Sequence, residues 1–505
     1  MPKKFTIVPG QLDLKSIKLI MVEKKTCVLD PSALPLINAS FEMVSKVIEE
    51  KRTVYGINTG FGSLANQRIS EEKLKQLQRN LVLSHACGTG ELLSDELVSL
   101  ILLLKINCLA QGFSGVSKEL IDALLVFLNK GIYPCIPAKG SVGASGDLSP
   151  LAHLALPLIG EGEVRYKGKI LSAEAGLKIA GFKPLQLAPK EGLALVNGLQ
   201  VSAALCIQAF LKAETLFEAA ILAGSLSVDA AFGSDIPFDD RIHLVRGHQA
   251  QRDVAAMYRE LLTGSAIRES HQQCIRVQDP YSLRCQPQIM GAILNQMRFV
   301  GETLQVEANS VTDNPLIFVE QADILSGGNF HGEIIAMAAD NLSLALAEIG
   351  ASSERRIALL MDKNISGLPA FLVKECGLNS GFMIAHISAA SCASDNKALA
   401  HPHSVDSIPT SANQEDHVSM STNAALRLFA MIDNCATILA IEFLAACQGL
   451  EFHKPFTTSP KLQKIYDKVR QQFPPYENDR YLGPEIATMK DKILKGDFAL
   501  NSVYG

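Results

Sequence analysis

Paired cysteines are absent from this sequence: the eleven cysteines stand singly, and no two of them form a CxxC pair. Their odd number and scatter argue against a disulfide framework or a zinc knuckle, and favour buried free thiols in a reducing cytoplasm. The N-terminal residues carry charge but no apolar segment, so no signal peptide is expected. We therefore expect a cytoplasmic protein.

A long apolar run typical of a membrane span is also missing. The longest uncharged stretch, residues 192–210, contains Asn197, Gln200 and Gln208, which indicates a core helix with a polar stripe. The net charge is only −5, so there is no basic surface for nucleic acid or anionic lipid. Neither a membrane nor a nucleic acid is expected as a partner.

Apolar residues, by contrast, are abundant, at 48% of the 505 residues against 20% charged. This share supplies a large core and is high for a monomer, and burial between subunits is one explanation. No internal repeat or low-complexity linker is present. Apolar residues recur at three- and four-residue spacing over 71–86, 96–110 and 118–129, which predicts helices there.

From residue 193 onward the apolar stretches are longer than the helices of a small domain. They cover residues 193–231, 288–310, 332–361, 377–400 and 420–450. Such lengths predict a bundle of long, nearly parallel helices. One strand pair is expected over 163–171, with a turn at Lys167-Gly168. The chain is predicted to consist of a small mixed N-terminal region (1–200), which holds two glycine-rich loops, and a long-helix bundle with C-terminal helices (201–505).

Residues 139–150, KGSVGASGDLSP, form a loop with three glycines in seven residues. Glycines permit positive φ angles and a close approach of backbone segments. The loop lacks the GxxxxGK[ST] spacing of a phosphate loop, the GxSxG of a nucleophile elbow, and the strand and GxGxxG of a dinucleotide loop. Taken alone, it is also compatible with a structural turn.

The chemistry that fits this loop is cyclisation of its own backbone. The amide nitrogen of Gly146 can attack the carbonyl carbon of Ala144, because glycine has no Cβ to block the approach, and Ser145 can lose its hydroxyl as water. The product is a 4-methylidene-imidazol-5-one ring, whose methylidene is a strong electrophile. No standard side chain is an electrophile, so an enzyme that needs one must bind a cofactor or build it. No external cofactor is expected.

The segment GSVGASGDLSPLAHLAL resembles the prosthetic-group motif of the aromatic amino acid ammonia-lyase family, and the resemblance extends from Tyr55 through the 410s. It implies that Ala144-Ser145-Gly146 forms the methylidene-imidazolone without an external cofactor. It also implies an all-α fold of the fumarase/aspartase-like ammonia-lyase type, built on a central bundle of long helices. Members of the family are tetramers whose active sites combine several subunits, so a homotetramer is expected.

Two further motifs supply catalytic groups by this resemblance. In the loop YGINTGFG, Tyr55 is the base that removes the β-proton, and it can act if donors or positive charge stabilise the tyrosinate. Asn197 donates to the carbonyl oxygen of the ring and so raises the electrophilicity of the methylidene. Leu199 stands where the family usually has threonine. Without the family, Tyr55 is as readily an ordinary loop tyrosine.

The segment QDPYSLRCQPQ and the loop GGNFHG supply substrate contacts by the same resemblance. Arg284 is the fork that binds the amino acid carboxylate through two parallel hydrogen bonds. Tyr281, a catalytic group, and Gln278 lie near the reacting carbons, and Phe330 lines the pocket beside the substrate side chain. Outside these motifs, Arg284 could bridge helices and Phe330 could belong to the core.

His85 and Glu415 indicate which amino acid is the substrate. Family members that act on phenylalanine or tyrosine tend to carry Phe-Leu or His-Leu where this chain has Ser84-His85, and they lack the Glu-Asp-His run of NQEDH at 413–417. Glu415 can accept a hydrogen bond from an imidazole N–H and His85 can orient the ring, whereas a buried carboxylate would disfavour a benzene ring. The expected reaction converts L-histidine to trans-urocanate and ammonia, as in histidine catabolism.

Several alternatives stay open at this point. One is a lyase or 2,3-aminomutase that acts on tyrosine or phenylalanine with the same prosthetic group. Another is a catalytically silent helical oligomer with a scaffold role, in which the Ala-Ser-Gly loop is uncyclised. His85 could also serve as a helix C-terminal cation, and Glu415 as a salt-bridge partner. A metal site is not expected, because HExxH spacing is lacking in the cluster His401, His403, Glu415, Asp416 and His417.

Overall fold

A computed structural model describes residues 4–271 and 277–500 of the chain. The chain divides into two compact units, each assembled from three separate stretches of sequence. Unit 1 consists of Met1–Gln208, Gly301–Asp340 and Pro402–Leu426, and unit 2 of Ala209–Val300, Asn341–His401 and Arg427–Gly505. The division at residue 200 that the sequence suggests stays a prediction.

Helices dominate the described residues, and the prediction of an all-α protein is confirmed. The α-helices are α1 (Leu14–Glu23), α2 (Leu34–Glu49), α3 (Leu74–His85), α4 (Asp95–Leu109), α5 (Lys118–Lys130), α6 (Leu148–Ala155), α7 (Ala173–Ala180), α8 (Glu191–Val196), α9 (Gln200–Ala230), α10 (Asp240–Leu244), α11 (Gln249–Leu262), α12 (Ala266–Glu269), α13 (Tyr281–Arg284), α14 (Gln286–Glu307), α15 (Glu333–Met361), α16 (Lys363–Ser366), α17 (Met383–Leu399), α18 (Ser421–Glu451), α19 (Pro460–Arg470) and α20 (Gly483–Leu494). The helices expected over 71–86, 96–110 and 118–129 correspond to α3, α4 and α5.

Short strands accompany the helices. They are β1 (Lys4–Ile7), β2 (Thr26–Leu29), β3 (Thr89–Leu92), β4 (Ile132–Pro134), β5 (Pro137–Lys139), β6 (Glu163–Tyr166), β7 (Lys169–Ser172), β8 (Leu316–Phe318) and β9 (Asp323–Leu325). The predicted pair is confirmed: β6 and β7 are antiparallel around Lys167 and Gly168, both at positive φ, and β4 joins them. The pairs β1–β2, β3–β5 and β8–β9 were not predicted, because strands of three or four residues show too little periodicity and no two-residue turn joins them.

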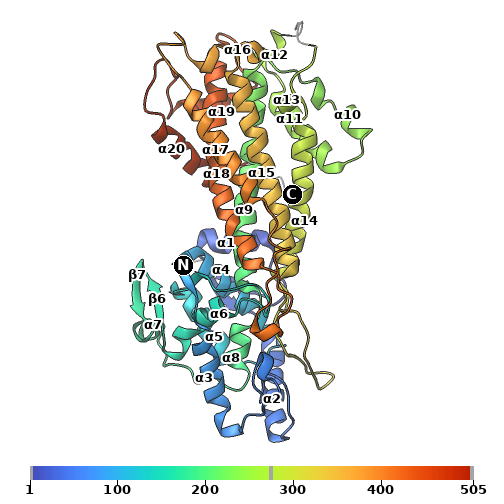
Figure 1. Cartoon of the computed structure of the whole chain (residues 1–505), viewed down its shortest axis with the longest axis vertical. Coiled ribbons are helices and arrows are strands. Elements are labelled where there is room, and N and C mark those ends of the chain that lie inside the picture. Colours follow the sequence, from blue (N-terminus) through green and yellow to red (C-terminus); the bar gives the residue numbers. More distant parts are fainter. Residues whose placement is uncertain (1–3, 272–276, 501–505) are drawn as a thin grey trace. The chain divides into compact units, whose positions relative to one another are not determined.

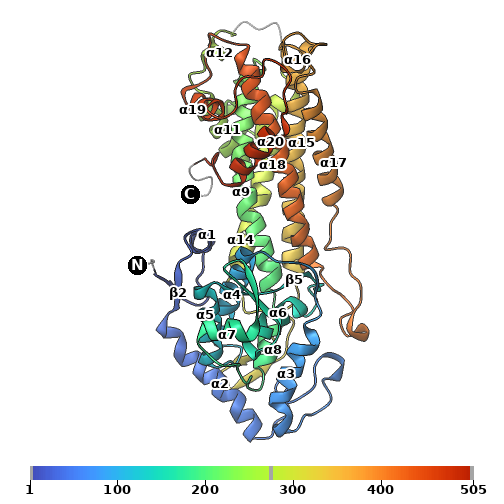
Figure 2. The ribbon, with the colours of Figure 1, turned by 90° about the vertical axis from the view of Figure 1, so that its left-hand side faces the viewer.

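The long helices α9, α14, α15, α17 and α18 lie side by side over most of their length in unit 2 (Figures 1 and 2), as the apolar stretches predicted. An ion pair buried in this bundle joins Arg356 of α15 to Glu442 of α18, with Nη2 2.9 Å from Oε2. Ser227 of α9 and Ser353 of α15 donate to the same carboxylate at 2.8 and 2.5 Å. The Glu442 carboxylate therefore joins three helices of the bundle, α9, α15 and α18.

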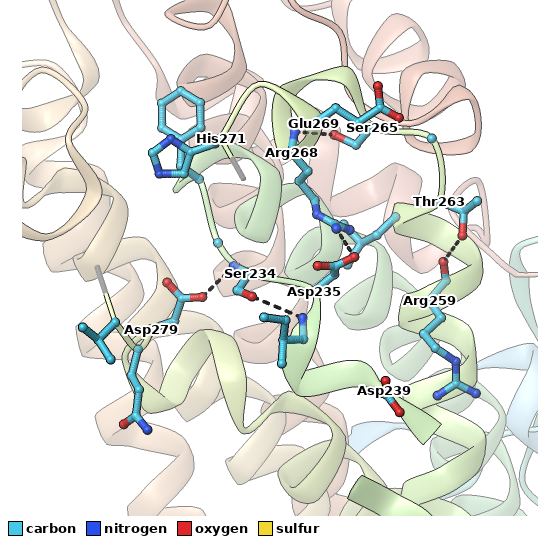
Figure 3. A pocket seen from close by; sticks show the side chains of 17 residues that line it. Ser234, Asp235, Asp239, Arg259, Thr263, Ser265, Arg268, Glu269, His271 and Asp279 are labelled. Carbon is cyan, nitrogen blue, oxygen red and sulfur yellow. Dashed lines mark hydrogen bonds and ion pairs between the residues drawn. The ribbon is translucent and has the colours of Figure 1, made fainter. Parts of the chain in front are cut away.

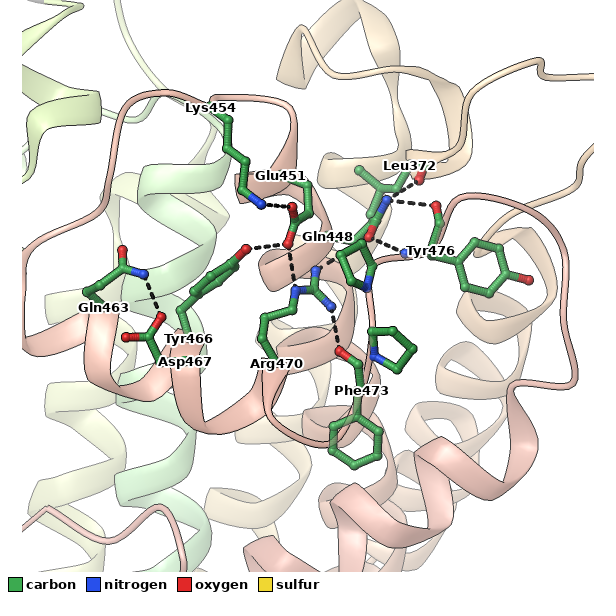
Figure 4. Close-up of polar contacts among 12 residues, drawn as sticks. Leu372, Gln448, Glu451, Lys454, Gln463, Tyr466, Asp467, Arg470, Phe473 and Tyr476 are labelled. Carbon is green, nitrogen blue, oxygen red and sulfur yellow. Dashed lines mark hydrogen bonds and ion pairs between the residues drawn. The ribbon is translucent and has the colours of Figure 1, made fainter.

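The C-terminal residues of unit 2 are fastened to the end of α18 (Figure 4). Arg470 of α19 donates to Glu451 at 2.7 Å, and Tyr466 donates to the same carboxylate. Gln448 donates to the backbone oxygen of Tyr476 at 3.0 Å and accepts from its N–H at 2.8 Å. These polar contacts order a proline-containing segment that has little helix of its own.

The expected core helix over residues 192–210 is wrong at one point, because it is broken into α8 and α9. Asn197 has an extended backbone (φ −92°, ψ 141°) and Gly198 has φ +119°, which a right-handed helix does not accommodate. Apolar periodicity continues across the break, so it hides the interruption. The break removes Asn197 from the helix and lets its side chain face another segment.

Two helices, α15 and α18, are long and apolar enough to cross a membrane by length and composition alone. The most apolar windows of these helices are 61% and 72% buried inside the structure, and core helices of soluble proteins have the same properties. The ten cysteines in the described ranges are all free thiols, and six of them are buried.

The buried ion pair leads to a prediction about stability. Replacing Arg356 by methionine leaves the Glu442 carboxylate unpaired in the bundle, so we expect the free energy of unfolding to fall by about 3–5 kcal/mol. Arg355→Met is the matched control, because the neighbouring side chain is 64% exposed and its loss costs at most about 1 kcal/mol. Urea unfolding followed by circular dichroism measures both, and equal effects would contradict the prediction.

Candidate active site

The Ala144-Ser145-Gly146 loop lies directly against the break between α8 and α9. Gly146 has φ +77° and forms a parallel bridge with Gly198, and the N–H of Asp147 donates to Gly198 O at 2.7 Å. A Cβ on Gly146 would lie 2.3 Å from Gly198 O and 2.6 Å from Gly198 N. Both the backbone angle and the close approach therefore require glycine at position 146.

Asp147 is a fully buried carboxylate that anchors the loop through hydrogen bonds. Its oxygens accept from Ser141 Oγ at 2.9 Å, from Ser202 N and Oγ at 2.7 and 2.6 Å, and from Thr422 Oγ1 at 2.8 Å. Burial raises the pKa of Asp147, and the hydrogen bonds from Ser202, Thr422 and Ser141 oppose that rise. One side chain thus ties the loop to the first turns of α9 and α18.

Segments before α15 and α18 hold the other side of the loop. Gly143 O accepts from Ser419 Oγ at 2.8 Å and from Gly332 N at 3.1 Å, while the N–H of Met420 donates to Val142 O at 2.8 Å. The backbone around Ala144 is therefore fixed on both sides. This is the constraint that cyclisation between neighbouring residues needs, since the reacting atoms must be held together.

Asn197 reaches the loop from the break after α8. Its Nδ2 donates to the carbonyl oxygen of Ser145 at 2.7 Å, the oxygen that a ring made from these three residues would keep. Its Oδ1 is buried and has no hydrogen-bond partner among the described residues. A methylidene-imidazolone fits this setting, because the donor already points at the ring oxygen and Gly146 leaves room for the closure.

A cavity of about 510 Å³ in unit 1 opens over the loop. Six of the predicted residues line it: Tyr55, His85, Ser145, Asn197, Phe330 and Glu415. Asn314 also lines it. Ala144 and Gly146 flank Ser145 in the loop itself. Tertiary structure thus brings together groups spread over 360 residues of sequence, from position 55 to position 415.

Glu415 is the carboxylate that contacts the Ser145 side chain. Its Oε1 accepts from Ser145 Oγ at 2.5 Å, and its Oε2 accepts from Thr410 Oγ1 at 2.6 Å and Ser411 Oγ at 2.9 Å. Partial burial opposes ionisation, but these three hydrogen bonds and the nearby His85 outweigh it, so the pKa of Glu415 is lowered. The cavity therefore holds an ionised acceptor at neutral pH.

His85 ends α3 beside this carboxylate. Its Nδ1 lies 3.1 Å from Ser84 Oγ, and burial lowers its pKa although Glu415 acts in the opposite direction. A neutral imidazole has one donor and one acceptor. His85 can therefore present a polar edge to a ligand in the cavity without adding a second fixed charge.

Tyr55 lies in a tightly hydrogen-bonded glycine-containing loop. Its hydroxyl oxygen accepts from Gly62 N at 3.4 Å. Asn58 holds the loop, accepting from Val54 N at 2.9 Å and donating to Arg52 O at 2.7 Å. Tyr55 lines the cavity and belongs to the same unit as the reactive loop.

Three predicted residues do not line this cavity: Gln278, Tyr281 and Arg284 belong to unit 2. Tyr281 is 69% exposed, and the Arg284 guanidinium lies over its ring, 4.6 Å from the centroid. Arg284 Nε is buried and has no hydrogen-bond partner within the described ranges. Gln278 lines a different cavity of about 890 Å³, together with Asp235 and Arg268, which form an ion pair (Figure 3).

Sequence reasoning missed two groups near the loop. Asp147 stands inside the recognised motif, but three of its four hydrogen bonds come from Ser202 and Thr422, distant positions that spacing does not reveal. Lys105 is the other: a single lysine in the apolar helix α4, fully buried, whose Nζ donates to the backbone oxygen of Asn197 at 2.7 Å. A lone charge inside the run LILLLKINCL was the available signal.

Two glycines with the same φ of +77° give a paired test of the loop. Gly146→Ala places a Cβ into Gly198, so we expect a lower thermal midpoint and a loop that stays uncyclised by mass. Gly168→Ala places its Cβ in open space, so only the backbone cost of about 1–2 kcal/mol applies. A Gly146→Ala protein that is cyclised and as stable as Gly168→Ala would refute the close-approach argument.

Comparisons with known proteins agree with this geometry. The sequence profile described as aromatic amino acid lyase matches residues 12–471. The chain is 72% identical to the histidine ammonia-lyase of Legionella pneumophila strain Lens over 500 residues, which is 99% of each chain.

Solved structures show the same fold. The crystal structure of histidine ammonia-lyase from Trypanosoma cruzi superposes with a TM-score of 0.90 at 39% identity, covering 98% of this chain and 94% of that one. The Pantoea agglomerans phenylalanine aminomutase gives a TM-score of 0.93 at 31% identity, covering 97% and 99%. The shared fold does not distinguish a histidine ammonia-lyase from a phenylalanine aminomutase. The profile match over residues 12–471 does identify the family. This chain belongs to the aromatic amino acid lyase family.

Proposed function

We propose that this protein eliminates ammonia from L-histidine and releases trans-urocanate. The observation that carries the proposal is the placement of Glu415 and His85 in one cavity with Ser145 and Tyr55. The 72% identity to an enzyme named histidine ammonia-lyase supports it over the alternative, since the phenylalanine aminomutase is only 31% identical. The chain is a carbon–nitrogen lyase, as the sequence predicted.

The electrophile of the proposed reaction comes from Ala144-Ser145-Gly146. The Gly146 nitrogen bonds to the Ala144 carbonyl carbon with loss of one water, and Ser145 loses its hydroxyl and α-hydrogen as a second water. Once formed, the ring would supply an electrophilic methylidene for the substrate amine. Asn197 holds the ring oxygen through the 2.7 Å hydrogen bond that its amide makes to Ser145 O.

Loss of the Ser145 hydroxyl also changes what Glu415 can bind. In the uncyclised loop that hydroxyl occupies Glu415 Oε1 at 2.5 Å, while Thr410 and Ser411 keep Oε2 in place. Without the hydroxyl, Oε1 is free to accept the N–H of the substrate imidazole. His85 orients the imidazole ring of the substrate, and Tyr55 removes the β-proton of the substrate.

The substrate carboxylate requires a positively charged partner, and the described residues that line the cavity of a single chain do not provide one. Among the described lining residues there is no arginine or lysine. Arg284, with its unpartnered Nε, belongs to unit 2 together with Tyr281 and Gln278. We therefore propose that a second copy of the chain contributes these three residues, in a homotetramer with shared active sites. A cytoplasmic location, without membrane or nucleic acid partners, belongs to the same proposal.

Product analysis tests the reaction. Purified protein given L-histidine should release urocanate and ammonia, whereas L-tyrosine and L-phenylalanine should give neither cinnamates nor β-amino acids. The intact mass should be two waters short of the sequence mass, and Ser145→Ala should abolish both the mass deficit and the activity. Absence of urocanate would overturn the proposal; a cinnamate product would then favour a tyrosine or phenylalanine ammonia-lyase, and a β-amino acid product a 2,3-aminomutase.

Glu415→Gln tests the imidazole contact separately. A hydrogen bond to a charged acceptor is worth about 1.5–3 kcal/mol, so kcat/KM for L-histidine should fall by roughly 10- to 100-fold. Ser411→Ala is the matched control, since it removes one donor and keeps the carboxylate, and its effect should be much smaller. The mass deficit shows whether each variant still cyclises. A Glu415→Gln enzyme with parental kcat/KM is incompatible with the assigned contact.

A further inference from the structure

Lys105 is a fully buried lysine in α4 whose hydrogen bonds go to uncharged groups. Its Nζ donates to the backbone oxygen of Asn197 at 2.7 Å and to Gln200 Oε1 at 3.1 Å. Burial lowers the pKa of Lys105 to about 8. Keeping an ammonium in such a place is costly, because water solvates the charge better than two carbonyl oxygens do.

Lys190, also fully buried, is the second such lysine among the described residues and forms a structural ion pair. Its Nζ lies 2.7 Å from Asp313 Oδ2 and 2.9 Å from Ser114 O, and both members of the ion pair are 0% exposed. The charge of Lys190 is thus compensated in direct contact. Lys105 has no such partner among its hydrogen bonds, so packing alone does not account for a lysine at this position.

The acceptor of Lys105 is one step from the reactive loop. The backbone oxygen of Asn197 receives the ammonium, and the side chain of the same residue donates to Ser145 O at 2.7 Å. Asn197 lies outside both helices, so helical hydrogen bonding does not hold its carbonyl. The other end of the break is fixed by Thr312, whose Oγ1 accepts from Leu199 N and Gln200 Nε2.

We propose that Lys105 is a positioning residue for the lyase reaction, fixing Asn197 so that its amide points at the carbonyl oxygen of Ser145. The inference rests on the proposed function, because that oxygen matters through the ring built from Ala144, Ser145 and Gly146. Lys105 itself touches neither substrate nor ring. It acts through the backbone oxygen of Asn197. Its ammonium is the hydrogen-bond donor to that oxygen, in place of the N–H donor that a continuous helix would provide.

A double-mutant cycle separates positioning from a general contribution to packing. The variants are Lys105→Met, Asn197→Ala and the two combined, in the full-length protein. If Lys105 acts through the side-chain amide of Asn197, replacing Lys105 should lower kcat only in protein that still carries this amide. Packing, in contrast, would be disturbed equally in both backgrounds.

In the parent protein, we expect Lys105→Met to lower kcat per cyclised site by about tenfold or more, with KM changed by less than about twofold. In the Asn197→Ala background, the same substitution should change kcat by less than about twofold. The near-ultraviolet absorbance of the cyclised loop should shift in each single variant and no further in the double variant. Mass spectrometry of the 144–146 peptide gives the cyclised share. Lys130→Met, which removes a lysine that donates to two backbone oxygens elsewhere in unit 1, should leave all three readouts unchanged.

Additive losses of kcat in the cycle, or parental kcat and absorbance in Lys105→Met, would overturn the inference. If Lys105→Met does not fold, Lys105→Gln replaces it; the amide keeps a donor without the charge, and its kcat should lie between those of the parent and Asn197→Ala. A parent protein without urocanate production and without the mass deficit would instead refute the proposed function. The two failures are therefore distinguishable.

Discussion

The close approach of Gly146 to Gly198 is the constraint on which the rest of the site depends. Two backbone segments lie so near each other that a single Cβ would come within 2.3 Å of a carbonyl oxygen. Such an approach has to be held in place, and the buried Asp147 does so by accepting hydrogen bonds from Ser202 and Thr422. The break between α8 and α9 exists at this point because Gly198 takes a φ that a helix excludes.

The same constraint places the polar groups that chemistry needs. With the helix broken, Asn197 turns its amide to Ser145, and its free backbone oxygen becomes the acceptor of Lys105. Glu415 accepts from the Ser145 hydroxyl, with Thr410 and Ser411 holding its second oxygen. Ser145 therefore contacts an amide donor through its carbonyl oxygen and an ionised acceptor through its hydroxyl.

Much of this arrangement could be predicted from sequence. The long apolar stretches predicted α14, α15, α17 and α18, and the family resemblance, which the comparisons confirm, selected six residues that line one cavity. The break at Asn197, the anchoring by Asp147 and the contact of Lys105 could not be predicted. Each depends on partners at least fifty residues away, and neither periodicity nor local propensity carries information about such pairs.

By itself, the sequence determined the helical class and the family, because these depend on local pattern and on motifs contiguous in the chain; it also proposed which groups do the chemistry. Only the tertiary structure decided which groups meet. It joined Ser145 to Glu415 across 270 positions and left Arg284 in a different unit from the cavity. The physical reason is that helix formation is governed by neighbours within a few residues, whereas a binding site is governed by packing between segments that the chain itself keeps far apart.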